Sequence, residues 1–191
     1  MTSLSADFDE LMRRVEAGRE FAHASFEPIF YLVIRPRDLL EVKRLMPAWT
    51  AKLTNAGWRV ETFSIAEHIA DILRGAPLRN VWLAADRKDP LAWGKTNAAL
   101  ANALTAQGRL QARLEERLAA LEGQTSTIML VTDLEALHPY LRIGAIEAQL
   151  QGKFHVPTVF FYPGTRTGKT RLKFLGFYPE DGNYRSVHVG G

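Results

Sequence analysis

The glycine-rich segment Gly164–Thr170 is the stretch whose residue types and spacing come closest to a known chemical site. It reads Gly-Thr-Arg-Thr-Gly-Lys-Thr and resembles a phosphate-binding loop. That loop needs four residues between its first glycine and the Gly-Lys pair, and here there are three. It also needs a helix behind it to receive the phosphate, whereas residues 171–177 have the pattern of a strand. We therefore interpret the segment as a basic hairpin turn. A degenerate nucleotide-binding enzyme that uses Asp133 with Lys169 or Arg142 remains an alternative.

Asp133 is a second candidate for chemistry, because it ends the apolar run Thr127–Thr132. A magnesium-orienting aspartate of nucleotide hydrolases has the same position after a buried strand. Asp133 also lies directly before Leu134-Glu-Ala-Leu137, where a helix could begin. We predict that its carboxylate caps that helix by accepting backbone N–H groups.

The histidines do not indicate a metal site, because no two of the five have the short spacing that places them on one helical face. No metal or cofactor is expected. The segment from His138 to Arg142 brings together an imidazole, a phenol and a guanidinium, without an adjacent nucleophile. Cysteine is absent and no serine has the flanking glycines of a nucleophile elbow. A protein contact is the favoured role for this segment.

Two apolar runs, residues 127–133 and 156–164, are expected to position these groups. Both are short, rich in β-branched and aromatic residues, and separated by a segment with helical spacing. This pattern is typical of a β-α-β unit with strands buried on both faces. Together with an apolar run at 29–34, it predicts a single-domain α/β fold with a mostly parallel sheet flanked by helices. Ligands of such sheets bind at the carboxyl ends of the strands.

The remaining segments are assigned by their periodicity. Residues 58–63 alternate as in a half-covered edge strand, and 80–86 form a weaker strand candidate. Leucines at helical spacing within 89–123 predict one long helix with a break near Gly108. Residues 169–176 and 184–189 also alternate, so we expect antiparallel C-terminal edge strands that either pair with each other or both extend the sheet.

Composition fits one domain that covers residues 1–191. The chain is 47% hydrophobic, has a net charge of +3, and contains no apolar run of the length that spans a bilayer. We expect a soluble cytoplasmic protein without a membrane contact. Its Lys and Arg residues are scattered among acidic ones, which favours a solvated surface, and direct DNA binding remains an alternative.

The carboxyl-terminal third resembles the BrxB family of bacteriophage-exclusion (BREX) loci. The family pattern has a Pro-aromatic-aliphatic-Arg helix start, a strand that ends in Phe-Tyr-Pro-Gly, a Leu-X-Leu-Phe-Gly strand and a closing Asn-Tyr-Tyr-Arg. The matching residues here are Pro139, Tyr140, Arg142, Tyr162, Pro163, Gly164, Leu172, Phe174, Gly176, Asn183, Tyr184 and Arg185.

The resemblance implies a non-catalytic component of a phage-defence complex that acts as a protein-binding adaptor. Its expected partner is PglZ, an alkaline-phosphatase-like protein, and further candidates are the BREX ATPase and the DNA methyltransferase. DNA would then be contacted through the complex. The predicted protein-binding residues are aromatic or basic and are expected at the strand ends and hairpin: Tyr140, Arg142, Tyr162, Arg166, Lys169, Tyr184 and Arg185.

Overall fold

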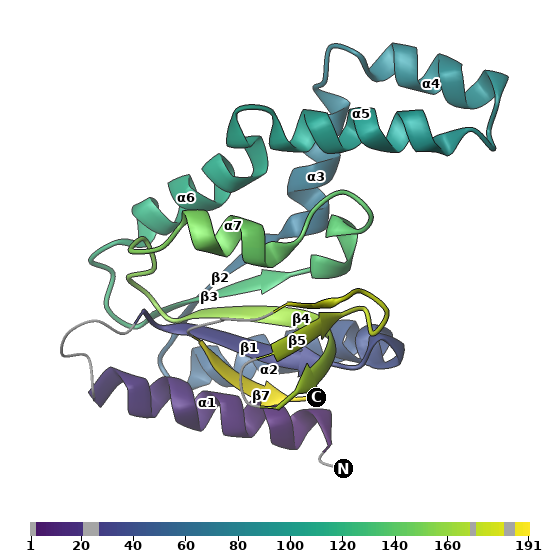
Figure 1. Ribbon diagram of the computed structural model, residues 1–191. Helices are drawn as coiled ribbons and strands as arrows, with labels where there is room; N and C mark the ends of the chain where they lie inside the picture. The colour runs from purple at the N-terminus through teal and green to yellow at the C-terminus, as the bar shows by residue number, and fades with distance from the viewer. Residues whose placement is uncertain (1–2, 21–26, 169–170, 182–185) are drawn as a thin grey trace.

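The computed structural model describes residues 3–20, 27–168, 171–181 and 186–191, and a mostly parallel sheet forms its centre (Figure 1). The strands are β1 (Ile29–Ile34), β2 (Arg59–Ser64), β3 (Thr127–Thr132), β4 (Thr158–Thr167), β5 (Arg171–Phe174), β6 (Glu180–Asp181) and β7 (Val187–Gly190). Five of them lie in the order β2-β3-β4-β1-β7 with every neighbouring pair parallel. β5 pairs antiparallel with β4, and β6 with β5. The predicted α/β fold class is confirmed.

Helices cover both faces of the sheet (Figure 1). On one face lie α1 (Leu4–Glu20) and α2 (Leu39–Asn55), and on the other lie α3 (Ile65–Arg74), α5 (Trp93–Thr105), α6 (Arg109–Leu121) and α7 (Ile143–Gln149). Successive residues of β1 point to opposite faces, so Phe30 and Leu32 pack with α1 and α2, whereas Tyr31 and Val33 pack with the other group. All six residues of β1 are buried, which explains its uninterrupted apolar sequence.

The edge strand β2 differs from the central strands, because only Phe63 of its six residues is buried. The predicted half-covered edge strand is confirmed. Its alternation of apolar and polar side chains follows from having one solvated face. Helix α2 continues through Pro47, so the proline does not end the helix.

The expected strand at residues 80–86 is wrong, because the segment lies within helix α4 (Arg79–Lys88). The apolar run at 81–83 imitates a strand, but the alanines and basic residues after it favour a helix. Thr96 Oγ1 of α5 donates a hydrogen bond to Asp86 of α4, with 2.9 Å between the oxygens. We call residues 78–96 the arm: α4, the connection and the start of α5, which project from the rest of the molecule (Figure 1).

The predicted break near Gly108 is confirmed. α5 is followed by a 3₁₀ turn, Ala106–Gly108, and then by α6. Gly108 has φ +62°, a left-handed conformation that glycine adopts without strain.

The two C-terminal strand segments do not pair with each other. β5 forms a hairpin with β4, whereas β7 lies on the far side of β1 and runs parallel to it, with Tyr31 opposite His188. The antiparallel part of the sheet is thus β4-β5-β6.

Candidate functional site

Asp133 lies at the centre of a polar network at the carboxyl ends of the strands. One carboxylate oxygen accepts hydrogen bonds from Ser64 Oγ at the end of β2 (2.7 Å) and from Thr132 Oγ1 (3.0 Å). The other oxygen is 2.8 Å from Nζ of Lys43 on α2. Lys43 Nζ also lies 2.9 Å from Glu135. The network therefore joins α2, β2 and β3.

The predicted helix cap at Asp133 is wrong. The segment that follows is a 3₁₀ turn, Leu134–Leu137, and the carboxylate of Asp133 makes no capping hydrogen bond to it. The Asp133 backbone has φ 58° and ψ 37°, a left-handed conformation that is uncommon for residues other than glycine. Its side chain is directed to Lys43, Ser64 and Thr132 instead.

The charges in this network stabilise one another. Burial opposes ionisation of Asp133, but hydrogen bonds from Lys43, Ser64 and Thr132 outweigh it and hold the pKa of the carboxyl below its usual value. The same hydrogen bonds to Asp133 and Glu135 raise the pKa of Lys43 above its ordinary range. The ionised forms of Asp133 and Lys43 are therefore favoured, and both oxygens of the Asp133 carboxylate have partners within the protein.

A second group of candidate residues forms an aromatic cluster beside the strand ends: His138, Arg142, Phe177 and Tyr178. The Arg142 guanidinium lies 4.0 Å from the centre of the Tyr178 ring, and His138 Nδ1 shares a hydrogen bond with Tyr178 Oη. Phe177 stacks on Tyr178 with ring centres 4.7 Å apart and is 64% exposed. Rings and a guanidinium arranged in this way are frequent at the centre of protein interfaces.

Tyr140 is half-buried next to this cluster. Burial raises the pKa of its phenol, and the carboxylate of Asp86 on α4 raises it further. The arm is thus within electrostatic reach of Tyr140.

Tyr162 is not available to a partner, because it is 1% exposed. Its position before Pro163-Gly164 suggested a strand end, but β4 continues to Thr167. The Tyr162 ring packs instead on Tyr31 and Phe174.

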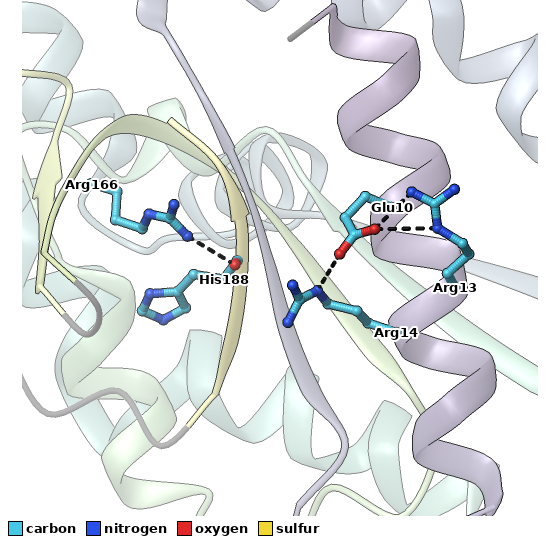
Figure 2. A network of polar contacts seen from close by, with 5 residues as sticks. All are labelled: Glu10, Arg13, Arg14, Arg166 and His188. Carbon is cyan, nitrogen blue, oxygen red and sulfur yellow. Dashed lines mark hydrogen bonds and ion pairs between the residues drawn. The ribbon is translucent and has the colours of Figure 1, made fainter. Parts of the chain in front are cut away.

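Arg166 is exposed on the hairpin and reaches β7, which β1 separates from β4 in the sheet. Figure 2 shows its Nη1 donating a hydrogen bond to the backbone carbonyl of His188, at 3.1 Å. Arg166 therefore fastens the hairpin to β7, in addition to presenting a charge.

The same view shows a separate group of contacts on α1, in which the Glu10 carboxylate accepts hydrogen bonds from both Arg13 and Arg14.

The other three predicted residues, Lys169, Tyr184 and Arg185, lie outside the described residues. On either side of residues 169–170 the backbone is extended, with β4 before and β5 after. β4 and β5 therefore pair as a hairpin, as predicted, although residues 164–167 belong to strand β4 and not to the turn. Residues 171–174 form strand β5 and not the helix that a phosphate-binding loop would require.

The arm is a surface that the sequence interpretation missed. It carries five of the seven large apolar side chains that are exposed among the described residues: Leu78, Val81, Leu83, Leu91 and Trp93. Its basic residues Arg79, Arg87, Lys88 and Lys95 form no ion pair with another described residue. The incorrect prediction of a strand at residues 80–86 implied that these apolar side chains were buried in the sheet, so no exposed surface was expected there. The signal available in the sequence was the short apolar stretch Leu91-Ala92-Trp93, which directly follows Pro90 and precedes Gly94.

Among the described residues, no group of three or more His, Asp or Glu side chains could hold a metal ion, and no helix is long and apolar enough to cross a membrane.

Comparison with curated proteins and with solved structures gave no match. A protein-family model described as BREX protein BrxB matches residues 62–189, which include the arm, Asp133, the aromatic cluster and strands β3 to β7. The chain belongs to the BrxB family. BrxB proteins are components of BREX phage-defence systems, so the expected partners are other BREX proteins. The resemblance drawn from the sequence is confirmed.

Proposed function

We propose that this BrxB protein is a non-catalytic adaptor that binds another protein of the BREX complex, with the arm as its main docking element. The concentration of exposed apolar side chains on the arm carries the proposal. Leu91 is 87% exposed, Trp93 62% and Val81 61%. Large exposed apolar side chains that are concentrated on one element favour an interaction site, because burying them against a partner removes apolar surface from water.

The absence of a catalytic role is part of the same proposal. Ser64 donates to Asp133 and accepts the backbone N–H of Glu67, so its hydroxyl already has partners on both sides. The Asp133 carboxylate is occupied by Lys43, Ser64 and Thr132. Arg142 stacks on Tyr178 and does not approach a carboxylate-based site. These contacts support a structural role for the strand-end residues.

The partner that we propose is PglZ, with the BREX ATPase and methyltransferase as further candidates. The test is co-expression of the two proteins followed by size-exclusion chromatography with light scattering and by titration calorimetry. We expect a stable complex at micromolar concentration. The double variant Leu91→Glu/Trp93→Glu is expected to weaken binding about 100-fold, since losing two central apolar contacts costs about 1–2 kcal/mol each.

The control is Leu40→Glu, which makes one such substitution at an exposed leucine of α2, away from the arm. It should leave the affinity within about twofold, a difference of roughly 0.4 kcal/mol. Separate elution of the two wild-type proteins, or equal effects of the arm and control variants, would contradict the proposal.

DNA binding is a second candidate, and the four arm cations that lack ion pairs favour it. Duplex binding through Arg79, Arg87, Lys88 and Lys95 would fall steeply with salt, with a slope of up to about −4 in a plot of log K against log salt. Failure to retard duplex DNA at low salt would remove this candidate without affecting the adaptor proposal.

A further inference from the structure

A cleft lies between α2 and the carboxyl ends of the strands, on the face opposite to α3, α6 and α7. Its volume is about 470 Å³, which is within the range of small-molecule sites. The walls are mainly apolar and come from α2 and from the strands beneath it: Ile34, Leu39, Val42, Met46, Pro47 and Phe161.

The position of the cleft follows from the connections of the sheet. After β1 the chain continues into α2 on one face of the sheet. After β2 and β3 it continues into α3 and into the η3 turn (Leu134–Leu137), which both lie on the other face. In α/β proteins the crevice at such a divergence is where ligands usually bind. The fold alone therefore marks this cleft, independently of the residues that line it.

The polar end of the cleft has an excess of negative charge. Its lining includes the carboxylates of Glu67, Asp133 and Glu135, and Lys43 is the one ammonium or guanidinium group in that lining. Lys43 Nζ already bridges Asp133 and Glu135, at 2.8 and 2.9 Å. A phosphate or carboxylate ligand would be repelled by the three carboxylates, and the Lys43 ammonium that could attract it is already paired with two of them. A positively charged ligand would instead be attracted by the excess negative charge.

We propose that this cleft binds a small organic cation: a molecule with a compact apolar body and one ammonium or guanidinium group. The apolar body packs between Met46 of α2 and Phe161 of β4. The charged group lies at the strand ends, where Glu135 and Glu67 attract it. This site is separate from the arm, so the proposal does not depend on the adaptor function.

The test uses three six-carbon probes that differ only in their head group: hexylamine, hexan-1-ol and hexanoate. Each is titrated into the full-length protein to about 10 mM, a range suited to ligands of this size. Amide NMR spectra are recorded at neutral pH. We expect hexylamine to shift the signals of Met46, Ser64 and Asp133 with saturation. Hexan-1-ol should bind about fivefold more weakly, since a partly exposed charge pair contributes up to about 1 kcal/mol, and hexanoate should not bind.

Two variants locate the site. Thr62→Trp fills the cleft from the exposed edge strand and should abolish the hexylamine shifts. Glu135→Gln removes one carboxylate and should weaken hexylamine about fivefold while leaving hexan-1-ol unchanged. Glu41→Gln is the control, because Glu41 lies on α2 outside the cleft and pairs with Arg44.

The proposal would be overturned by any of three results. These results are the absence of a saturable shift with hexylamine, an affinity for hexylamine no higher than that for hexanoate, and hexylamine shifts that persist in Thr62→Trp. If Thr62→Trp does not give a dispersed spectrum of a folded protein, the comparison of Glu135→Gln with Glu41→Gln decides: equal hexylamine affinities in the two variants would contradict the site.

Discussion

Lys43 and Asp133 form an ion pair across the strand ends, with Nζ and Oδ1 2.8 Å apart. Lys43 lies on α2 and Asp133 follows β3, so the ion pair connects two elements that are far apart in the sequence. Glu135 adds a second carboxylate to the same ammonium. The pair is partly shielded from water, since the Asp133 side chain is 20% exposed.

We expect Lys43→Met to lower the free energy of unfolding by about 1–2 kcal/mol, because it leaves a half-buried carboxylate without its charged partner. Urea denaturation at neutral pH measures the change. Arg44→Met is the control: Arg44 is on the same helix and pairs with Glu41 at the surface, at 3.4 Å. It should cost less than about 0.5 kcal/mol. Equal losses in the two variants would show that the tie to Asp133 does not stabilise the fold.

Glu147 should make stability fall as the pH rises toward neutrality. Its carboxyl group accepts a hydrogen bond from Tyr31 Oη. Burial raises its pKa from 4.5 to about 7, the Tyr31 bond opposes that shift in part, and Glu27 and Asp181 add to it. Because the folded state holds this proton more tightly than the unfolded chain, the contribution is complete below about pH 4.5. It is lost between there and about pH 7, and amounts to up to ~3 kcal/mol.

Glu147→Gln tests this dependence, because glutamine can still accept the Tyr31 hydrogen bond and does not ionise. The free energies of unfolding at pH 5 and pH 8 should differ less in this variant than in the wild type. Glu116→Gln, which changes an exposed carboxylate of α6, should keep the wild-type difference. An unchanged difference in Glu147→Gln would mean that other groups cause it.

Gly164 is required by the close approach of β4 and β5. A Cβ atom there would lie 2.3 Å from the carbonyl oxygen of Lys173 and 2.7 Å from Cε1 of Tyr162. Gly164→Ala should therefore destabilise the protein by about 2 kcal/mol or more, since the backbone atom cannot move without breaking the strand pairing. Gly94→Ala is the control: apart from its chain neighbours and its own helix backbone, no atom lies within 4 Å of the added Cβ. Alanine in α5 should be neutral or stabilising by up to about 1 kcal/mol. In thermal melts, Gly164→Ala should lower the melting temperature, and Gly94→Ala should leave it unchanged or raise it.

The sequence predicted the central sheet well, because strands buried on both faces such as β1 and β3 must be continuously apolar. The prediction failed where a side chain contacts a residue that is distant in the sequence. The cap at Asp133 was a local inference, whereas its actual partners Lys43 and Ser64 are 90 and 69 residues away in the chain. Tyr162 was misplaced for a related reason: a turn-forming Pro-Gly pair lies within β4, whose later part joins the antiparallel hairpin.

The arm was missed because local sequence does not reveal whether an apolar run has a partner in the same chain. Residues 81–83 are compatible with a buried strand or with a helix. Only the tertiary structure shows that Trp82 is the one buried side chain of α4, while Val81 and Leu83 face outward. We propose that Val81 and Leu83 become buried when the partner protein binds.

The arm should also unfold separately from the sheet. α4 contributes one buried side chain, Trp82, whereas α6 contributes four, including Leu114. We expect Leu114→Ala to lower the global free energy of unfolding by about 3 kcal/mol, as is usual for a large core residue. Trp82→Ala should lower it by less than about 1 kcal/mol, because the loss falls on a segment that opens without the core.

Hydrogen exchange provides the direct measurement of this difference. In the wild type, amides of α4 should exchange faster than those of α6, and Trp82→Ala should accelerate exchange in the arm alone. Binding of the partner should then slow exchange at residues 79–88 and leave α6 unchanged, because a ligand that binds only the folded arm stabilises it by mass action. If α4 and α6 exchange at the same rate in the free protein, the arm is part of the global folding unit.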